Sequence, residues 1–304
     1  MLKENKDLAP TAALLTAVIL WGGSFPAMRT AVQALNPWAV MWGRMVIALI
    51  IILPFSGKVF PKNYRAGDWK LLLPAILFQP CLYFLLESNA LRYTTSSQAG
   101  VIASAVPLLA ALGARLFLAE SISRKTLVGL FLSLAGVTAL TLLQGDDSRA
   151  ENPLLGNAME LCAMTVGTAN LIMIKQLSRR YNPWSLTAMQ VGAGTIFFSP
   201  GLYFLLKTDA ATWTPDLLGA MLFLGGLVTL GAFGLYNWGL SRLPTNRASA
   251  FLNLIPVTAV FLGWLWLDET LNVPQLMAAG VVVLGVRLSQ VGGNRRVATA
   301  PRVQ

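Results

Sequence analysis

Histidine is missing from this sequence of 304 residues, and only 12% of its residues are charged. Ordinary soluble domains contain about 25% charged residues. Without histidine the chain has no imidazole base, no histidine ligand for haem and none of the usual zinc ligand sets. The two cysteines, Cys81 and Cys162, both lie inside apolar stretches, which argues against a disulfide framework. We therefore expect no cofactor and no metal.

Long polar segments are also missing, because 55% of the residues are hydrophobic and the mean hydropathy is +0.62. A helix that crosses a bilayer needs about 20 apolar residues, so the chain has room for about ten spans and for no soluble domain of any size. Its only Gly-Lys pair, Gly57-Lys58, lacks the upstream glycine of a phosphate-binding loop. The sequence therefore predicts an all-α polytopic membrane protein without an ATPase domain.

Apolar windows between turn-forming residues predict ten membrane-spanning helices. We place them at residues 10–34, 38–56, 69–91, 96–118, 126–143, 154–176, 184–206, 215–240, 246–267 and 274–291. The first follows Lys3 and Lys6, as in a signal peptide, but it runs past a normal apolar core without a small-residue cleavage site. It is therefore expected to be a retained helix.

The net charge of +10 is carried by short basic clusters between the apolar runs. This pattern orients membrane proteins, because cytoplasmic loops carry the excess of Lys and Arg, and it does not indicate nucleic-acid binding. With the N-terminus inside, the cytoplasmic side receives most basic residues, among them Lys58, Lys62, Arg65, Lys70, Arg124, Lys125, Lys175, Arg179, Arg180, Arg242, Arg247, Arg295 and Arg296. Both termini are therefore predicted to be cytoplasmic.

The chain repeats itself weakly at about half its length. A shift of 149 residues aligns residues 91–137 with 240–286 and superposes Ala99 on Ala248, Pro107 on Pro256, Ala110 on Ala259, Leu116 on Leu265, Leu118 on Leu267 and Glu120 on Glu269. Earlier in each half, Asn36-Pro37-Trp38 matches Asn182-Pro183-Trp184. We interpret residues 1–146 and 153–291 as two five-helix repeats, followed by a basic tail at 292–304.

Each predicted repeat has an odd number of spans, so the two copies insert with opposite orientations. Such inverted repeats are typical of secondary transporters, whose halves rock about a site near the middle of the membrane. The alternative is a duplicated scaffold or channel without alternating access.

Several short motifs resemble those of the drug/metabolite transporter superfamily, and within it the EamA family. The residues that carry the resemblance are Trp21-Gly22-Gly23-Ser24-Phe25, Asn36-Pro37 followed by Arg44, Leu118-Ala119-Glu120 and Leu267-Asp268-Glu269. The resemblance implies a ten-helix inner-membrane carrier, commonly an exporter of amino acids or other small metabolites. The second half departs from the pattern, with Gln190 in place of Arg44 and no Trp-Gly counterpart.

Polar residues inside the predicted spans are the first candidates for a substrate site, because they are costly in hydrocarbon and usually face a cavity or a partner. Gln79, Tyr83 and Glu87 recur every four residues, which predicts one helix face. This face is either a cavity wall, with Glu87 able to carry a proton, or an outer end at which Glu87 reaches interfacial water.

The repeat also superposes two polar pairs, Ser97 with Ser104 and Asn246 with Asn253. Ser97 and Asn246 suit helix N-caps. Ser104 and Asn253 lie deeper and are cavity candidates, with ties between neighbouring helices as the alternative.

Glu160 in the sixth span is the second candidate for proton coupling, and Tyr236 and Asn237 in the eighth are cavity candidates. The alternative for Glu160 is a salt bridge or hydrogen bond between helices. Arg29 and Arg44 are expected either to pair with these carboxylates or to snorkel towards the interface.

Three residues of the first span, Trp21, Ser24 and Phe25, complete the cavity candidates. Trp21 and Phe25 lie one turn apart and either line an aromatic cavity or anchor the helix at the interface. Gly22-Gly23 and Pro26 either bend this span or allow close packing. Glu120 and Glu269 precede the expected caps Ser123 and Asn272 and are assigned a structural role.

The leading hypothesis is a secondary transporter that exports small metabolites, amino acids or related amphipathic compounds foremost, by alternating access. Its expected partners are a small-molecule substrate, the lipid bilayer and, as a further candidate, protons. One alternative is an uncoupled facilitator of the same class, and another is a non-transporting scaffold or sensor. An intramembrane enzyme is disfavoured, because the sequence has no histidine, no paired-aspartate motif and no nucleophile elbow.

Overall fold

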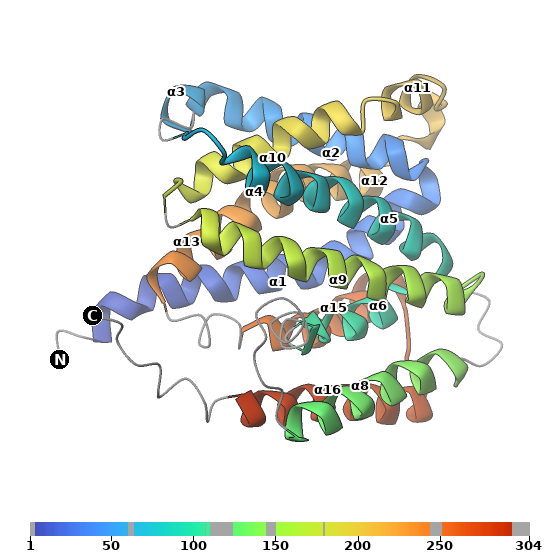
Figure 1. Ribbon diagram of the computed structural model, residues 1–304. Coiled ribbons are helices and arrows are strands. Elements are labelled where there is room, and N and C mark those ends of the chain that lie inside the picture. Colours follow the sequence, from blue (N-terminus) through green and yellow to red (C-terminus); the bar gives the residue numbers. More distant parts are fainter. Residues whose placement is uncertain are drawn as a thin grey trace, which may run out of the picture.

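A computed structural model describes residues 4–59, 64–106, 108–109, 124–143, 150–178, 180–243 and 251–293, and every regular element in these ranges is helical (Figure 1). The first half contains α1 (Glu4–Ala34), α2 (Pro37–Ile52), η1 (Leu53–Phe55), α3 (Ser56–Val59), α4 (Trp69–Ile76), η2 (Leu77–Leu82), α5 (Tyr83–Tyr93), α6 (Ser96–Ala103) and α8 (Arg124–Leu142). The second half contains α9 (Pro153–Leu177), α10 (Pro183–Phe197), α11 (Gly201–Leu206), η3 (Ala210–Thr212), α12 (Pro215–Leu222), η4 (Phe223–Ala232), α13 (Phe233–Arg242), η5 (Phe251–Leu254), α15 (Ile255–Leu267) and α16 (Val273–Gly293).

Helices lie within each of the ten intervals that the sequence predicts. Within the described ranges, five helical stretches are long and apolar enough to cross a membrane, namely Leu8–Ala34, Pro37–Phe55, Trp69–Tyr93, Pro153–Ile174 and Pro215–Leu240. Successive long helices run in alternating directions, and α1 begins and α16 ends towards the left of Figure 1. The chain is therefore a polytopic, all-helical membrane protein.

The seventh predicted span is wrong as a single helix. α10 ends at Phe197, a turn follows at residues 198–200, and α11 begins at Gly201. Proline at position 200 has no N–H to continue the α10 ladder. A Cβ added to Gly201 would lie 2.1 Å from the carbonyl oxygen of Trp38, so glycine allows the close approach of α11 to α2.

The repeated Asn-Pro-Trp motif forms the same local structure in both halves. Asn36 accepts a hydrogen bond from the backbone N–H of Trp38, and Asn182 accepts one from that of Trp184, each at 3.0 Å. The following proline occupies the first helical turn, where its missing N–H costs nothing. The motif therefore starts α2 and α10 in the same way.

α1 runs across the middle of the view in Figure 1 and packs against α5, α6, α13 and α15. It runs as one helix with Pro10 and Pro26 inside it. A Cβ on Gly22 would lie 1.8 Å from Thr258 Oγ1, and one on Gly23 would lie 3.2 Å from a Leu262 methyl carbon. The glycine pair thus allows close packing of α15 on α1, which is the second of the two roles considered for it.

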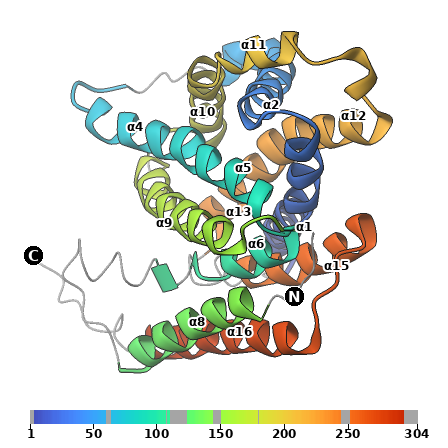
Figure 2. The ribbon, with the colours of Figure 1, turned by 90° about the vertical axis from the view of Figure 1, so that its right-hand side faces the viewer.

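α8 and α16 form a separate pair at the lower edge of both views (Figures 1 and 2). At the start of α16, Asn272 Oδ1 accepts from Gln275 N at 2.8 Å, and Gln275 Oε1 accepts from Asn272 N at 3.0 Å. This reciprocal capping box confirms the structural role expected for Asn272. Glu120 and Ser123, expected at the equivalent place in the first half, lie outside the described residues.

Candidate functional site

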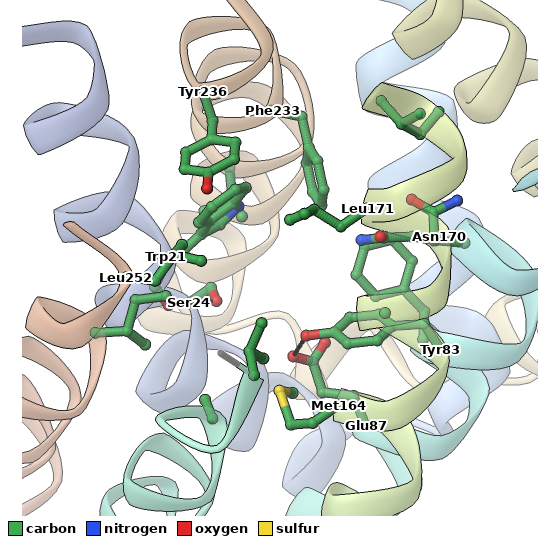
Figure 3. A pocket seen from close by; sticks show the side chains of 18 of the residues that line it. Trp21, Ser24, Tyr83, Glu87, Met164, Asn170, Leu171, Phe233, Tyr236 and Leu252 are labelled. Carbon is green, nitrogen blue, oxygen red and sulfur yellow. Dashed lines mark hydrogen bonds between the residues drawn. The ribbon is translucent and has the colours of Figure 1, made fainter. Parts of the chain in front are cut away.

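A cavity lies between helices of both halves of the chain (Figure 3). It contains about 970 Å³ of space free of protein atoms, counting the part that is open to solvent. Its described polar lining residues are Ser24, Arg44, Gln79, Tyr83, Glu87, Asn170, Gln190, Tyr236 and Asn237. Most of its other lining residues are aromatic or aliphatic, among them Trp21, Phe25, Phe84, Met164, Leu171, Phe233, Leu240 and Leu252.

Most of the sequence-predicted site residues meet in this cavity. The residues that line it are Trp21, Ser24, Phe25, Gln79, Tyr83, Glu87, Tyr236 and Asn237. Ser104 is not among the lining residues, and its hydroxyl donates to the carbonyl of Val101 at 2.6 Å at the end of α6. Glu160 is fully buried and is not among the lining residues. The side chain of Asn253 and the whole of Asn246 lie outside the described part of the chain.

The third span is broken at Gln79, so the prediction of one regular helix face for its polar residues is wrong. Gln79 has φ −142° and ψ 121°, and it precedes Pro80, which disfavours helical geometry at the residue before it. Gln79, Tyr83 and Glu87 nevertheless all reach the cavity. The break therefore removes the regular helical spacing of these three residues, but all three still line the same cavity.

Two amide side chains bind the backbone around this break. Gln190 on α10 donates to the carbonyl oxygen of Gln79 at 2.9 Å, and Asn170 on α9 donates to that of Ala75 at 2.6 Å. In lipid, carbonyl groups released by a helix break need such partners. Neither amide is among the predicted site residues, although a proline inside a predicted span indicates that neighbouring helices must supply polar groups.

Arg44 on α2 is buried at the cavity wall, with an exposed fraction of 1%, so snorkelling to the interface is the wrong expectation for it. Its Nε donates to Thr229 Oγ1 at 2.9 Å, and its guanidinium lies 4.3 Å from the centre of the Phe84 ring. Glu87 on α5 is close enough to Arg44 to interact with it electrostatically. Tyr83 donates to Glu87 Oε1 at 2.7 Å, which fixes this carboxylate at the cavity (Figure 3).

An aromatic wall stands opposite these charged groups. The centre of the Trp21 ring lies 5.2 Å from that of Phe233 and 4.7 Å from that of Tyr236 (Figure 3). Trp21 Nε1 is buried without a hydrogen-bond partner among the described residues. Ser24 also lines the cavity, but its hydroxyl donates to the carbonyl of Trp21 at 2.7 Å. This wall offers an apolar surface with an unused N–H donor.

Glu160 on α9 is fully buried, and neither of its carboxylate oxygens has a hydrogen-bond partner in the described part of the molecule. It is close enough to Glu87 and Tyr83 to interact with both electrostatically. The salt bridge or hydrogen bond considered for this residue is thus not observed there. An unpaired charge in an apolar interior is expensive, so such a carboxyl group is favoured in its neutral form.

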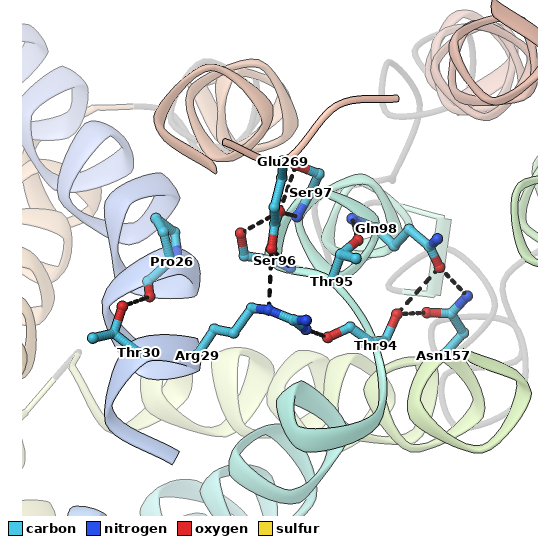
Figure 4. Close-up of polar contacts among 10 residues, drawn as sticks. All are labelled: Pro26, Arg29, Thr30, Thr94, Thr95, Ser96, Ser97, Gln98, Asn157 and Glu269. Carbon is cyan, nitrogen blue, oxygen red and sulfur yellow. Dashed lines mark hydrogen bonds and ion pairs between the residues drawn. The ribbon is translucent and has the colours of Figure 1, made fainter. Parts of the chain in front are cut away.

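Arg29 lies in a second polar cluster (Figure 4) and is not among the residues that line the cavity. Its Nε is 3.2 Å from Glu269 Oε1, and it also donates to the carbonyl of Thr94. It is 3% exposed and pairs with neither suspected intramembrane carboxylate, so both expectations for Arg29 are corrected.

Glu269 connects this cluster to the start of α6. Its carboxylate accepts from Ser96 N at 3.1 Å and Ser97 N at 2.9 Å, and from both serine hydroxyls. Glu269 therefore has the structural role predicted for it, but its carboxylate binds the start of α6 and not the start of α16, the helix that follows it in the sequence. The N-cap of α6 is Thr95, which accepts from Gln98 N at 3.2 Å, so Ser97 is not the cap.

A third polar cluster joins the segment before α4 to the segment after α9. Asp68 accepts hydrogen bonds from Tyr181 Oη at 2.5 Å, from Arg65 N at 2.9 Å and from the Arg180 guanidinium. The hydrogen bonds from Tyr181 and Arg180 hold the pKa of Asp68 at about 2. Burial and the bond to Asp68 raise the pKa of Tyr181 to about 12.

The depressed pKa of Asp68 predicts a pH-dependent contribution to stability. The ionised form is the one stabilised by folding, so the contribution is complete above the ordinary aspartate value of 3.8 and disappears as the pH falls through about 2. Asp68→Asn should therefore lower the unfolding temperature at pH 7 and at pH 5 by the same amount, and by less at pH 3. Thermal unfolding in detergent at the three pH values measures this. Equal differences at all three would contradict it.

Both the sequence and the fold of this chain are similar to those of known proteins. A family model described as "EamA-like transporter family" matches residues 10–142 and again residues 154–290. A solved crystal structure superposes with a TM-score of 0.60 at 17% identity, over 93% of this chain and 96% of that chain, which supports the fold.

Several curated proteins are similar over nearly their whole length. "Uncharacterized transporter YetK" of Bacillus subtilis is 25% identical over 93% of this chain and 87% of its own. An "S-adenosylmethionine/S-adenosylhomocysteine transporter" of Chlamydia trachomatis is 28% identical over 93% and 89%, respectively. A "Probable terminal-alkyne amino-acid exporter" of Streptantibioticus cattleyicolor is 23% identical over 95% and 96%. Since the family model matches nearly the whole chain, the protein belongs to the EamA-like transporter family and has a general transport role.

Proposed function

We propose that this protein is a secondary transporter that moves small amphipathic metabolites, amino acids or their derivatives foremost, through the cavity by alternating access. The observation that carries the proposal is the composition of the cavity, which combines Arg44, Glu87 and amide groups with an aromatic wall. Its lining comes from both segments that match the family model. Two halves around one central site are the arrangement that rocking requires.

The direction proposed is export across an inner membrane, with both termini in the cytoplasm. The clustering of basic residues between the spans supports the orientation. The names of the relatives from Chlamydia and Streptantibioticus include transport of an amino-acid derivative and amino-acid export. These names support the same substrate class for this chain.

We further propose that protons are coupled to transport through Glu87 and Glu160. Glu87 lines the cavity, whereas Glu160 is not among the lining residues and has no hydrogen-bond partner in the described part. Tyr83 donates to Glu87 and interacts with Glu160, and Arg44 is the cation near this group. A carboxylate that binds the substrate and a proton alternately would link proton movement to substrate movement across the membrane.

The experiment that tests the function is uptake into liposomes that contain the purified protein. Labelled amino acids and small aromatic metabolites are presented with and without an imposed proton gradient. Accumulation above equilibrium that an ionophore abolishes would support the coupled transporter. Equilibration independent of the gradient would instead establish the uncoupled facilitator. No flux from folded protein for any compound of the panel would favour the non-transporting scaffold.

Replacing Glu160 by Gln should leave equilibrating flux in place and abolish accumulation driven by the proton gradient. Glutamine has nearly the shape of the neutral acid but cannot release a proton. The measurement is the ratio of accumulated to equilibrium substrate in liposomes, with Glu151→Gln, an exposed acid before α9, as the control. Unchanged accumulation in Glu160→Gln would remove this residue from the coupling mechanism.

A further inference from the structure

The position of Arg44 carries an inference about which substrates fit the cavity, and this inference rests on the transport function proposed above. Arg44 and Gln190 each lie eight residues after the asparagine that caps their helix, and both line the cavity. Gln190 donates to the Gln79 carbonyl and so serves the backbone. The two equivalent positions thus differ, and only the first places a cation at the cavity.

The Arg44 side chain is held in place from two other elements. Thr229 in η4 accepts from its Nε and donates in turn to the carbonyl of Leu224 at 2.7 Å, and the ring of Phe84 on α5 lies against the guanidinium plane. A guanidinium has five N–H donors in a fixed fork, and Thr229 takes the one on Nε. The two terminal nitrogens form the fork that matches a carboxylate.

The other charged group is arranged in the same way. Glu87 is 5% exposed and fixed by the hydroxyl of Tyr83, whose own ring also lines the cavity. Among the described lining residues, Arg44 is the cation and Glu87 is the carboxylate. A zwitterion presents an opposite charge to each of the two groups, whereas a ligand with a single charge complements one of them.

We infer that Arg44 binds the carboxylate of a zwitterionic substrate, that Glu87 binds its ammonium group, and that Trp21, Phe233 and Tyr236 contact its apolar side chain. The substrate class is therefore α-amino acids with an apolar or aromatic side chain. Loss of a buried hydrogen bond to a charged group costs about 1.5–3 kcal/mol, which is about 10- to 100-fold in affinity.

The test compares phenylalanine with two analogues that each lack one charge, phenethylamine and 3-phenylpropionate. Binding to purified protein is measured by calorimetry and flux is measured in liposomes. Wild type should bind phenylalanine at least tenfold more tightly than either analogue. Arg44→Gln should lose this preference over phenethylamine while keeping that over 3-phenylpropionate, and Arg44→Lys should retain part of it. Arg92→Gln, at an exposed arginine at the end of α5, is the matched control.

The outcomes separate this inference from the function on which it rests. Selective binding that depends on Arg44 without any flux supports the substrate class and overturns the transport proposal. Equal binding and flux of all three compounds supports transport and overturns the role of Arg44. An equal loss for all three compounds in a folded Arg44→Gln protein would show that Arg44 only neutralises Glu87, which also overturns it. No binding and no flux of any of the three in folded wild type overturns the substrate class.

Discussion

Replacing Glu269 by Ala should lower the free energy of unfolding by about 3–5 kcal/mol, the cost of breaking a buried ion pair on one side. The change removes the Glu269 carboxylate from beside the buried Arg29 guanidinium, and it removes the acceptor of the Ser96 and Ser97 backbone N–H groups. Equilibrium unfolding in mixed micelles with SDS measures the loss. Glu151→Ala, at an exposed acid, is the control and should change the free energy by less than about 0.5 kcal/mol.

Exchanging the two charges should not repair this site. A simple ion pair tolerates reversal, but Glu269 also accepts from the first N–H groups of α6, at the positive end of that helix. Arginine at position 269 has only N–H donors in its side chain, so it could not accept the hydrogen bonds of these backbone N–H groups. We therefore expect Arg29→Glu with Glu269→Arg to be at least as unstable as either single change. Recovery to wild-type stability would show that the pair acts through charge alone.

The helices follow from local features of the sequence. The start of α2 at Pro37 and that of α10 at Pro183 are encoded by a capping asparagine and a proline, which act within one turn. Apolar run length likewise fixes where spans are placed. Such signals do not depend on the rest of the fold, so they are legible in a single sequence.

Side-chain contacts between residues that are far apart in the sequence cannot be predicted from such local signals. Arg29 and Glu269 are separated by most of the chain, and the hydrophobic periodicity of a helix does not predict which distant residues it will contact. Ser104 was expected at the cavity, but its hydroxyl donates to a carbonyl of its own helix. Polar residues in spans were a sound signal for the cavity, and applying it to Asn170 as well would have found a further lining residue.

Replacing Gly100 by Ala should destabilise the protein by about 1–3 kcal/mol, because the added Cβ would lie 2.2 Å from the Cβ of Ala259. This contact joins α6 to α15, one helix from each half. Gly280→Ala is the matched control, since a Cβ there meets nothing within 4 Å. That control should be neutral or slightly stabilising, as alanine favours a helix over glycine by about 1 kcal/mol.

A size exchange distinguishes close packing from backbone freedom as the reason for Gly100. With Ala259→Gly in the same chain, the Ala259 Cβ is gone, and the remaining neighbours of the new Cβ are the Cα of residue 259 at 3.7 Å and Phe25 at 4.0 Å, both ordinary contacts. The helix penalty of glycine then moves from α6 to α15 and cancels. The double variant should therefore unfold within about 1 kcal/mol of wild type in the same micelle assay. If it stays as unstable as Gly100→Ala, glycine is needed at position 100 for backbone freedom, and the two halves do not depend on this small-residue contact.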